Sequence, residues 1–255
     1  MAEQKQKQKF PSEVIDLPSE GKVYPKDSPL SGGKIELKYM TAREEDILTS
    51  QNLIKKGVVI DKLLDSLILT EGIKCDDLIL GDKNAVMVAA RVLAYGADYN
   101  CMVTNPNNNE SFETTINLTD CPFRKLPEDI SSNSFSLELP LSKKKVTFKL
   151  LTGIEEKAIE QDLKASKKVG SDISPELTTR LRHTITSVDG DNSQSTINNF
   201  VQNLLARDSL FLRSEIKKMT PDIELKQEVE IEGETVEVAI PMTVNFFWPD
   251  SEASL

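Results

Sequence analysis

Two segments of the chain show the same pattern of apolar and polar positions. Residues 34–48 read KIELKYMTAREEDIL and residues 145–159 read KVTFKLLTGIEEKAI, and the two align without a gap. Each begins with alternation, which predicts a strand that runs directly into a helix. We therefore interpret the segments as two copies of one unit. The identical pairs are Lys34/Lys145, Lys38/Lys149, Thr41/Thr152, Glu44/Glu155 and Glu45/Glu156.

The point at which each strand passes into a helix carries the pattern Thr-x-x-Glu. Thr41 and Glu44 hold this spacing in the first segment, and Thr152 and Glu155 hold it in the second. In such a capping box the Thr side chain accepts a hydrogen bond from a backbone N–H, and the Glu side chain reaches back to the N–H of the cap residue. We predict that these four residues cap helices. The pattern indicates an architecture rather than a reaction.

The first copy continues with further helices and a hairpin. Apolar spacing predicts helices over residues 42–53 and 59–68, and a third helix that is capped by Asp82 and ends at Gly96. Residues 99–104 and 111–118 then alternate around the turn Asn105-Pro-Asn-Asn-Asn, which predicts a β-hairpin.

The second copy repeats this order. A capped helix over residues 153–168 is followed by a helix that opens at Ser174-Pro175. Two further helical patterns cover residues 197–205 and 210–219, and a hairpin covers residues 227–231 and 235–240. The apolar face of the helix after Pro175 holds Leu177, Leu181, Ile185 and Val188.

The predicted fold is α+β, with two tandem repeats of strand, helix cluster and β-hairpin and an extended N-terminal arm. Residues 1–30 form a disordered tail and an extended docking arm, because residues 10–29 hold four prolines and a glycine. The first repeat covers residues 31–125, the second covers residues 126–250, and residues 251–255 form a polar tail. Chance similarity of two amphipathic segments is the alternative to duplication.

Charge and hydropathy exclude two classes of partner. The chain carries 41 acidic and 31 basic residues, a net charge of −10 at pH 7. Such a surface repels phosphate backbones, so we exclude nucleic acid as the main partner. No apolar run approaches the roughly 18 residues of a membrane span, and the polar, lysine-rich start contains no apolar signal segment. The chain is therefore expected to be cytosolic.

Residues suited to metal binding or catalysis are sparse. Cys75, Cys101 and Cys121 form no Cys-x-x-Cys pair, and the single histidine, His183, lies between apolar positions of a predicted helix. We predict no metal and no cofactor. Phosphate-binding glycine loops and the nucleophile-elbow motif do not occur, and helix capping explains the paired acids. We predict no catalytic residues, which leaves a protein that binds other proteins.

Two segments offer candidate contacts for a protein partner. In the proline-rich arm, Leu17 and Tyr24 have no periodic element in which to be buried. Near the C-terminus, Phe246, Phe247 and Trp248 gather three aromatic residues in succession. Aromatic anchors of this kind are enriched at interface hot spots. The alternative is that this C-terminal segment closes the core of the second copy.

Several stretches resemble a known family. IDLPSEGKVYP at residues 15–25, LSGGKIELKYMTAREEDILTSQNLIKKG at 30–57, VIDKLLDSLI at 59–68, LGDKNAVMVAARVLAYGADY at 80–99 and IPMTVNFFWPD at 240–250 are similar to T-even-type myophage baseplate hub proteins. More narrowly, they resemble the baseplate hub assembly proteins of contractile-tailed phages. The resemblance covers residues 14–250.

This resemblance implies a non-catalytic factor or minor subunit that binds other baseplate hub proteins while the tail baseplate is assembled in the host cytoplasm. The tape-measure protein is a further implied partner. A permanent structural subunit of the hub or tail adaptor, retained in the virion, is the alternative. An enzyme, such as a hydrolase that uses His183, is a weaker third class. The family supplies no catalytic, metal-binding or cofactor-binding residues to this sequence.

Overall fold

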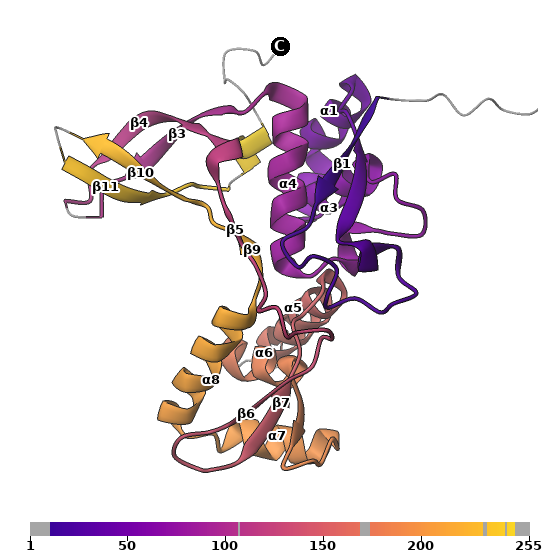
Figure 1. The fold of residues 1–255 in the computed structure, drawn as a ribbon, viewed down its shortest axis with the longest axis vertical. Helices are drawn as coiled ribbons and strands as arrows, with labels where there is room; N and C mark the ends of the chain where they lie inside the picture. The colour runs from indigo at the N-terminus through magenta and orange to yellow at the C-terminus, as the bar shows by residue number, and fades with distance from the viewer. Residues whose placement is uncertain (1–10, 107, 169–173, 232–233, 243, 248–255) are drawn as a thin grey trace, which may run out of the picture.

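The computed structural model describes residues 11–106, 108–168, 174–231, 234–242 and 244–247. Helices and small antiparallel sheets are mixed, which is the α+β class that the sequence predicts. Figure 1 shows one group of helices from the N-terminal half and one from the C-terminal half, with a pair of hairpins that extends from the former.

The N-terminal half opens with two antiparallel strands. β1 (Ser12–Asp16) pairs with β2 (Lys34–Lys38) along its whole length. The helices that follow are α1 (Ala42–Thr49), α2 (Gln51–Lys55), α3 (Val59–Leu67) and α4 (Leu80–Tyr95). The single helix predicted over residues 42–53 is interrupted at Ser50, whose extended backbone, with ψ of 103°, separates α1 from α2.

The proline-rich segment belongs to the core of this half. It supplies strand β1, and the side chains of Leu17, Val23 and Leu30 are buried. The Leu17 N–H donates to the Gly33 carbonyl at 2.8 Å, which holds the loop beside the start of β2. Pairing and burial correct the prediction of an extended docking arm for residues 11–30, because the chain itself covers these apolar side chains. Residues 1–10 lie outside the described residues.

The C-terminal half contains a three-stranded antiparallel sheet. Its strands are β6 (Phe135–Glu138), β7 (Lys145–Phe148) and β8 (Ile185–Val188), in the order β6-β7-β8. Its helices are α5 (Gly153–Lys168), α6 (Glu176–Thr184), α7 (Gln194–Gln202) and α8 (Ala206–Met219). The prediction of Ile185 and Val188 on a helical face is wrong. The helix ends at Thr184, and β-branched residues favour pairing with the free edge of β7.

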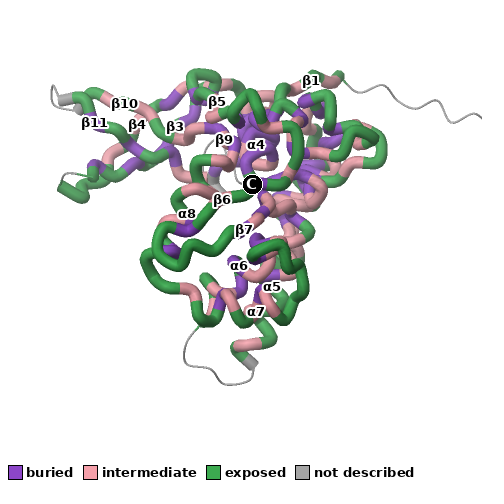
Figure 2. Tube along the Cα trace, turned by 60° about the horizontal axis from the view of Figure 1, so that its bottom comes forward, coloured by how far each residue is buried: buried purple, intermediate pink, exposed green. Residues whose placement is uncertain are grey.

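Two hairpins pack against each other through their apolar faces. β3 (Asp98–Thr104) pairs with β4 (Ser111–Asn117), and β10 (Lys226–Ile231) pairs with β11 (Glu234–Ala239), as the alternating patterns predict. Buried or intermediate positions alternate with exposed positions along these strands, as Figure 2 shows. The short strands β5 (Phe123–Arg124) and β9 (Asp222–Ile223) pair between the hairpins and the C-terminal helices (Figure 1).

Buried side chains form two clusters that cross the predicted repeat boundary. The larger cluster joins the N-terminal half with both hairpins and includes Phe246 and Phe247. The smaller cluster contains the sheet and helices of the C-terminal half together with Val23 and Ile79. The division at residues 125 and 126 therefore does not separate two cores. The C-terminal hairpin packs on the first half, because its apolar face is covered by that of β3 and β4.

The burial of the proline-rich segment predicts how substitutions within it affect stability. Leu30 has no exposed surface, so Leu30→Ala should lower the free energy of unfolding by about 2–5 kcal/mol. Val14 lies in the same segment and is 59% exposed, so Val14→Ala is a matched control that should cost less than about 0.5 kcal/mol. Urea denaturation followed by circular dichroism measures both. Equal effects would contradict the burial of this segment.

Candidate functional site

A buried carboxylate joins β2, α1 and α3 in the N-terminal half. Glu44 accepts hydrogen bonds from the Thr41 backbone N–H at 3.0 Å and from the Thr41 hydroxyl at 2.7 Å. Its other oxygen lies 2.7 Å from both Lys38 Nζ and the Ser66 hydroxyl. Burial opposes ionisation, but Lys38, with Ser66 and Thr41, lowers the pKa of Glu44 to about 2. The capping glutamate is therefore also the ion-pair partner of the preceding strand.

The C-terminal half contains the same constellation at α5. Glu155 accepts hydrogen bonds from the Thr152 N–H at 2.9 Å and from the Thr152 hydroxyl at 2.5 Å, and Lys149 Nζ lies 2.5 Å from its other oxygen. Although burial opposes it, Lys149 and Thr152 lower the pKa of Glu155 to about 2. The side chain of Glu155 is 24% exposed, so this copy is more open than the first. In both copies the Glu reaches back to the cap N–H as the sequence predicts.

Asp82 in the first turn of α4 holds the loop between β1 and β2. Its carboxylate accepts from the Ser19 N–H at 2.9 Å, from the Ser19 hydroxyl at 2.6 Å and from the Tyr24 hydroxyl at 2.7 Å. Tyr24 also accepts from the Ile79 N–H at 3.0 Å. Burial raises the pKa of Asp82 against the effect of these hydrogen bonds. Tyr24, which we predicted to contact a partner, thus bonds within the chain.

Asp208 in the first turn of α8 does the same for the loop between β6 and β7. Its two oxygens accept from the Leu141 and Ser142 N–H groups, each at 2.9 Å. Burial opposes ionisation, but these N–H groups lower the pKa of Asp208. In each half, therefore, the last helix places an aspartate under the loop that connects the first two strands of that half.

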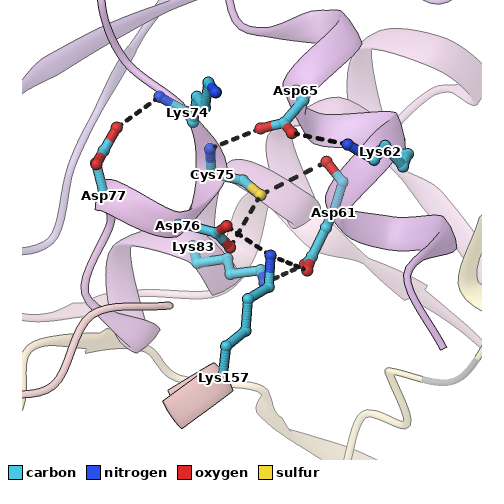
Figure 3. A network of polar contacts seen from close by, with 9 residues as sticks. All are labelled: Asp61, Lys62, Asp65, Lys74, Cys75, Asp76, Asp77, Lys83 and Lys157. Atoms are coloured by element: carbon cyan, nitrogen blue, oxygen red, sulfur yellow. Dashed lines mark hydrogen bonds and ion pairs between the residues drawn. The ribbon is translucent and has the colours of Figure 1, made fainter. Parts of the chain in front are cut away.

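Ion pairs connect the two halves (Figure 3). Lys157 of α5 lies 3.0 Å from Asp61 of α3 and 2.5 Å from Asp76, and Lys83 of α4 also pairs with Asp61 at 2.6 Å. Burial disfavours the charge on Asp61, but Lys83 and Lys157 lower its pKa. One lysine of the C-terminal half thus pairs with two carboxylates of the N-terminal half.

The same network contains a candidate metal-binding group. Asp61, Cys75 and Asp76 place potential ligand atoms within 4.8 Å of one another. Both carboxylates are already paired with lysines, and burial raises the pKa of the Cys75 thiol, which keeps it protonated. A cation would have to displace Lys83 and Lys157. We therefore assign this cluster to the junction between the halves.

Two glycines allow the backbones of the two halves to approach closely. A Cβ on Gly153 would lie 2.7 Å from Asp76 Cα, and one on Gly81 would lie 1.8 Å from the Pro221 carbonyl oxygen. The Gly153 N–H donates to the Leu78 carbonyl at 3.1 Å. Any larger residue at these positions would push α4 and α5 away from their neighbours.

A cleft of about 520 Å³ runs along the junction. Apolar side chains and the ion pairs of Lys157 line it, and a nucleophile next to a general base does not occur among its lining residues. His183 lies elsewhere and pairs with Asp162 at 2.9 Å. Part of the cleft wall is apolar. Its apolar lining includes Val58, Leu78, Leu80, Ile159 and Leu163.

The predicted partner contacts near the chain ends are core residues in this structure. Leu17 is 1% exposed, and Phe246 and Phe247 have no exposed surface. The Phe246 ring meets the Tyr99 ring edge-on, with centroids 5.0 Å apart. These side chains are corrected from docking residues to core residues, and the core they complete is that of the N-terminal half. Trp248 lies outside the described residues.

Sequence reasoning gave Asp82 the role of a helix cap, but the N-cap of α4 is Ile79 and Asp82 binds the loop between β1 and β2 instead. The roles of Asp208 and of the junction lysines were missed. Alignment of the two copies, extended to their last helices, would have paired Asp82 with Asp208, each in a first helical turn. The identity of Lys38 and Lys149 was visible but had no partner assigned. Nothing in the sequence pattern links Lys157 with Asp61, because a long-range contact sets that pair.

Comparison with known proteins gives a family match. A family model described as T4 bacteriophage base plate protein matches residues 12–248. No curated protein and no solved structure matches the chain. Across the described ranges, the helices lack the length and apolar character needed to cross a membrane.

The two capping glutamates provide a matched pair of substitutions. Glu44→Gln should lower the free energy of unfolding by about 1–3 kcal/mol, because it removes a charge from buried hydrogen bonds. Glu155→Gln should cost less, since its site is partly exposed. Because folding lowers the pKa of Glu44 from its ordinary value of 4.5 to about 2, ionised Glu44 stabilises the folded protein at pH values above 4.5. This contribution is lost as the pH falls toward 2.

The stability of the Glu44→Gln variant should therefore fall less steeply than that of the wild type between about pH 5 and pH 3. Urea denaturation at several pH values tests this expectation. Parallel curves for variant and wild type would contradict an ionised Glu44.

The junction lysine should matter more than a surface lysine on the same helix. Lys157→Gln should lower the free energy of unfolding by about 1 kcal/mol or more, because it leaves two carboxylates close together without their shared cation. Lys164 pairs with Glu160 on the exposed face of α5, so Lys164→Gln should cost less than about 0.5 kcal/mol. Denaturation at low and high salt measures both, and equal losses would remove the special role of Lys157.

Proposed function

The chain belongs to the family of T4 bacteriophage base plate proteins, and on that premise we propose that it is a baseplate hub assembly protein. It acts as a non-catalytic factor or minor subunit that binds other hub proteins while the tail baseplate is built in the host cytoplasm. The family match over residues 12–248 carries this proposal, because it spans both halves and both hairpins.

The arrangement of the two halves supports a binding role. Ion pairs of Lys157, the close approach at Gly81 and Gly153, and a shared hairpin core fix the halves to each other. A fixed body of this kind presents its outer surfaces in a constant relative position. Such preorganisation lowers the entropic cost of binding and suits a protein that aligns neighbouring subunits.

We further propose that the two halves arose by duplication of one unit. Each half contains a strand lysine paired with the capping glutamate, and each contains an aspartate that holds the loop between its first two strands. Each is followed along the chain by a β-hairpin. Duplication explains why residues far apart in sequence have equivalent partners.

Exposed leucines at the far end of the C-terminal half are consistent with contact to another protein. Leu141 is 52% exposed, Leu205 is 48% exposed and Leu210 is 61% exposed. The Leu141 N–H donates to Asp208 in the first turn of α8, so the backbone at Leu141 lies close to the start of that helix, where Leu205 is the N-cap. A hub protein that covered them would remove apolar surface from water.

The alternative is a permanent structural subunit of the hub or tail adaptor. The family description favours it, since that description names a base plate protein and no assembly step. The two proposals differ in whether the chain stays in the finished particle. The tape-measure protein is a further proposed partner under either.

The expected result is that the full-length chain, co-expressed with each baseplate protein of its phage, co-purifies with at least one hub protein. The major capsid protein serves as the control prey and should not co-purify. Mass spectrometry of purified virions then measures how much of the chain is retained. Amounts far below those of the hub proteins support an assembly factor, and equal amounts support a structural subunit. Failure to bind any baseplate protein would refute both.

A further inference from the structure

Most of the net charge of the chain lies in the two hairpins. Residues 98–117 and 226–239 contain eight acidic residues and one basic residue, so they hold seven of the ten net negative charges. The hairpins project from the helical body in Figure 1. Their inner faces cover each other, which leaves one polar outer face on each hairpin free.

The outer face of β10 and β11 sets like charges directly opposite each other. Glu228 pairs in register with Glu237, and Glu230 follows on the same face of β10. The Ile240 N–H bonds to the Leu225 carbonyl, so hydrogen-bonded pairs alternate from there and Glu228 and Glu237 form a non-hydrogen-bonded pair. Side chains are closest in such pairs, and like charges across them destabilise a sheet.

The chain does little to neutralise these carboxylates itself. Lys226 pairs with Glu237 at 2.5 Å, and burial does not shield either side chain, since both are more than half exposed. Among the ion pairs of the described residues, Glu228 and Glu230 take part in none. An arrangement that costs stability and is left uncompensated within the chain indicates that a cationic group from outside supplies the compensation.

The free edge of β10 carries the same residues. In an antiparallel pair, the backbone N–H and C=O groups of non-hydrogen-bonded residues point away from the partner strand. Those of Glu228 and Glu230 therefore point to the outer edge of β10, which pairs with no strand among the described residues. An added strand would bond to these backbone groups and place its own side chains beside both glutamates.

We propose that the outer edge and outer face of β10 dock an extended segment of another baseplate protein that carries lysine or arginine at alternate positions. The inference rests on the proposed function and names the chemistry of one of its contacts. A second copy of this chain is disfavoured, because its hairpins would repel these. A lone divalent cation fits poorly, because carboxylates on a flat exposed face do not converge as its ligands must.

The test neutralises the three glutamates at constant shape. E228Q/E230Q/E237Q is compared with E138Q/E160Q/D162N, which removes three exposed acids from the C-terminal half and changes the net charge equally. Biolayer interferometry with each purified baseplate protein of the phage measures affinity. The hairpin variant should lose at least about tenfold in affinity for one of them at low salt, whereas the control variant should bind as the wild type does.

A stability measurement separates lost binding from lost folding. Removing the repulsion between Glu228 and Glu237 should leave the melting temperature of the hairpin variant unchanged or raised. Coupling with a zero-length carboxyl-to-amine cross-linker should then join Glu228 or Glu230 of the wild type to a lysine of the partner, as mass spectrometry of the complex would show.

The outcomes distinguish this inference from the function on which it rests. If the wild type binds no baseplate protein, the proposed function fails. If a baseplate protein binds and the hairpin variant binds it within about twofold of the wild type, the inference is overturned while the function stands. A third outcome would also overturn the inference. Ca²⁺ or Mg²⁺ would raise the stability of the wild type but not that of the hairpin variant, while both bound the partner equally. The outer face of β10 would then be a cation-binding site.

Discussion

A carboxylate that leaves water must keep its hydrogen bonds, and this requirement ties the strands and loops of each half to its helices. Glu44, Asp82 and Asp208 have no or almost no exposed surface. Each lies in the first turn of a helix. Asp82 and Asp208 accept hydrogen bonds from loops 63 and 67 residues away in sequence, and Glu44 accepts one from Lys38 of the preceding strand. Because an unpaired buried carboxylate is costly, the loop between the first two strands of each half is held against the last helix of that half.

The junction between the halves uses the same chemistry at a partly exposed place. Lys157 pairs with both Asp61 and Asp76, while Gly81 and Gly153 let the backbones of the two halves come close together. The carboxylates on the outer face of the β10–β11 hairpin differ from these. Glu44, Asp82 and Asp208 have hydrogen-bond partners within the chain, whereas Glu228 and Glu230 stand on an open face and take part in no ion pair of the described residues. This open acidic face is the part of the surface that we propose to bind a basic segment.

Local sequence patterns predicted the elements that depend on local interactions. The reach-back hydrogen bonds of Glu44 and Glu155 join residues three positions apart, and both hairpins form around turns that the sequence marks. The predictions were wrong where contacts with residues distant in sequence determine the structure. Ile185 has the spacing of a helical face, yet the free edge of β7 makes it part of a strand. Leu17 has no periodic element of its own, yet the core of its half covers it.

The sequence by itself determined the α+β class, the two capped helices and the occurrence of one strand–helix pattern in two places. These features depend on the spacing of residues that are close together in the chain. Only the tertiary structure decided which apolar residues are core and which acids are paired. Phe246 is buried because β10 and β11 bring the end of the chain to Tyr99 of the first half, across a separation that no local pattern encodes. Whether a side chain is buried or a charge is paired depends on segments that are distant in the sequence and are brought together by folding.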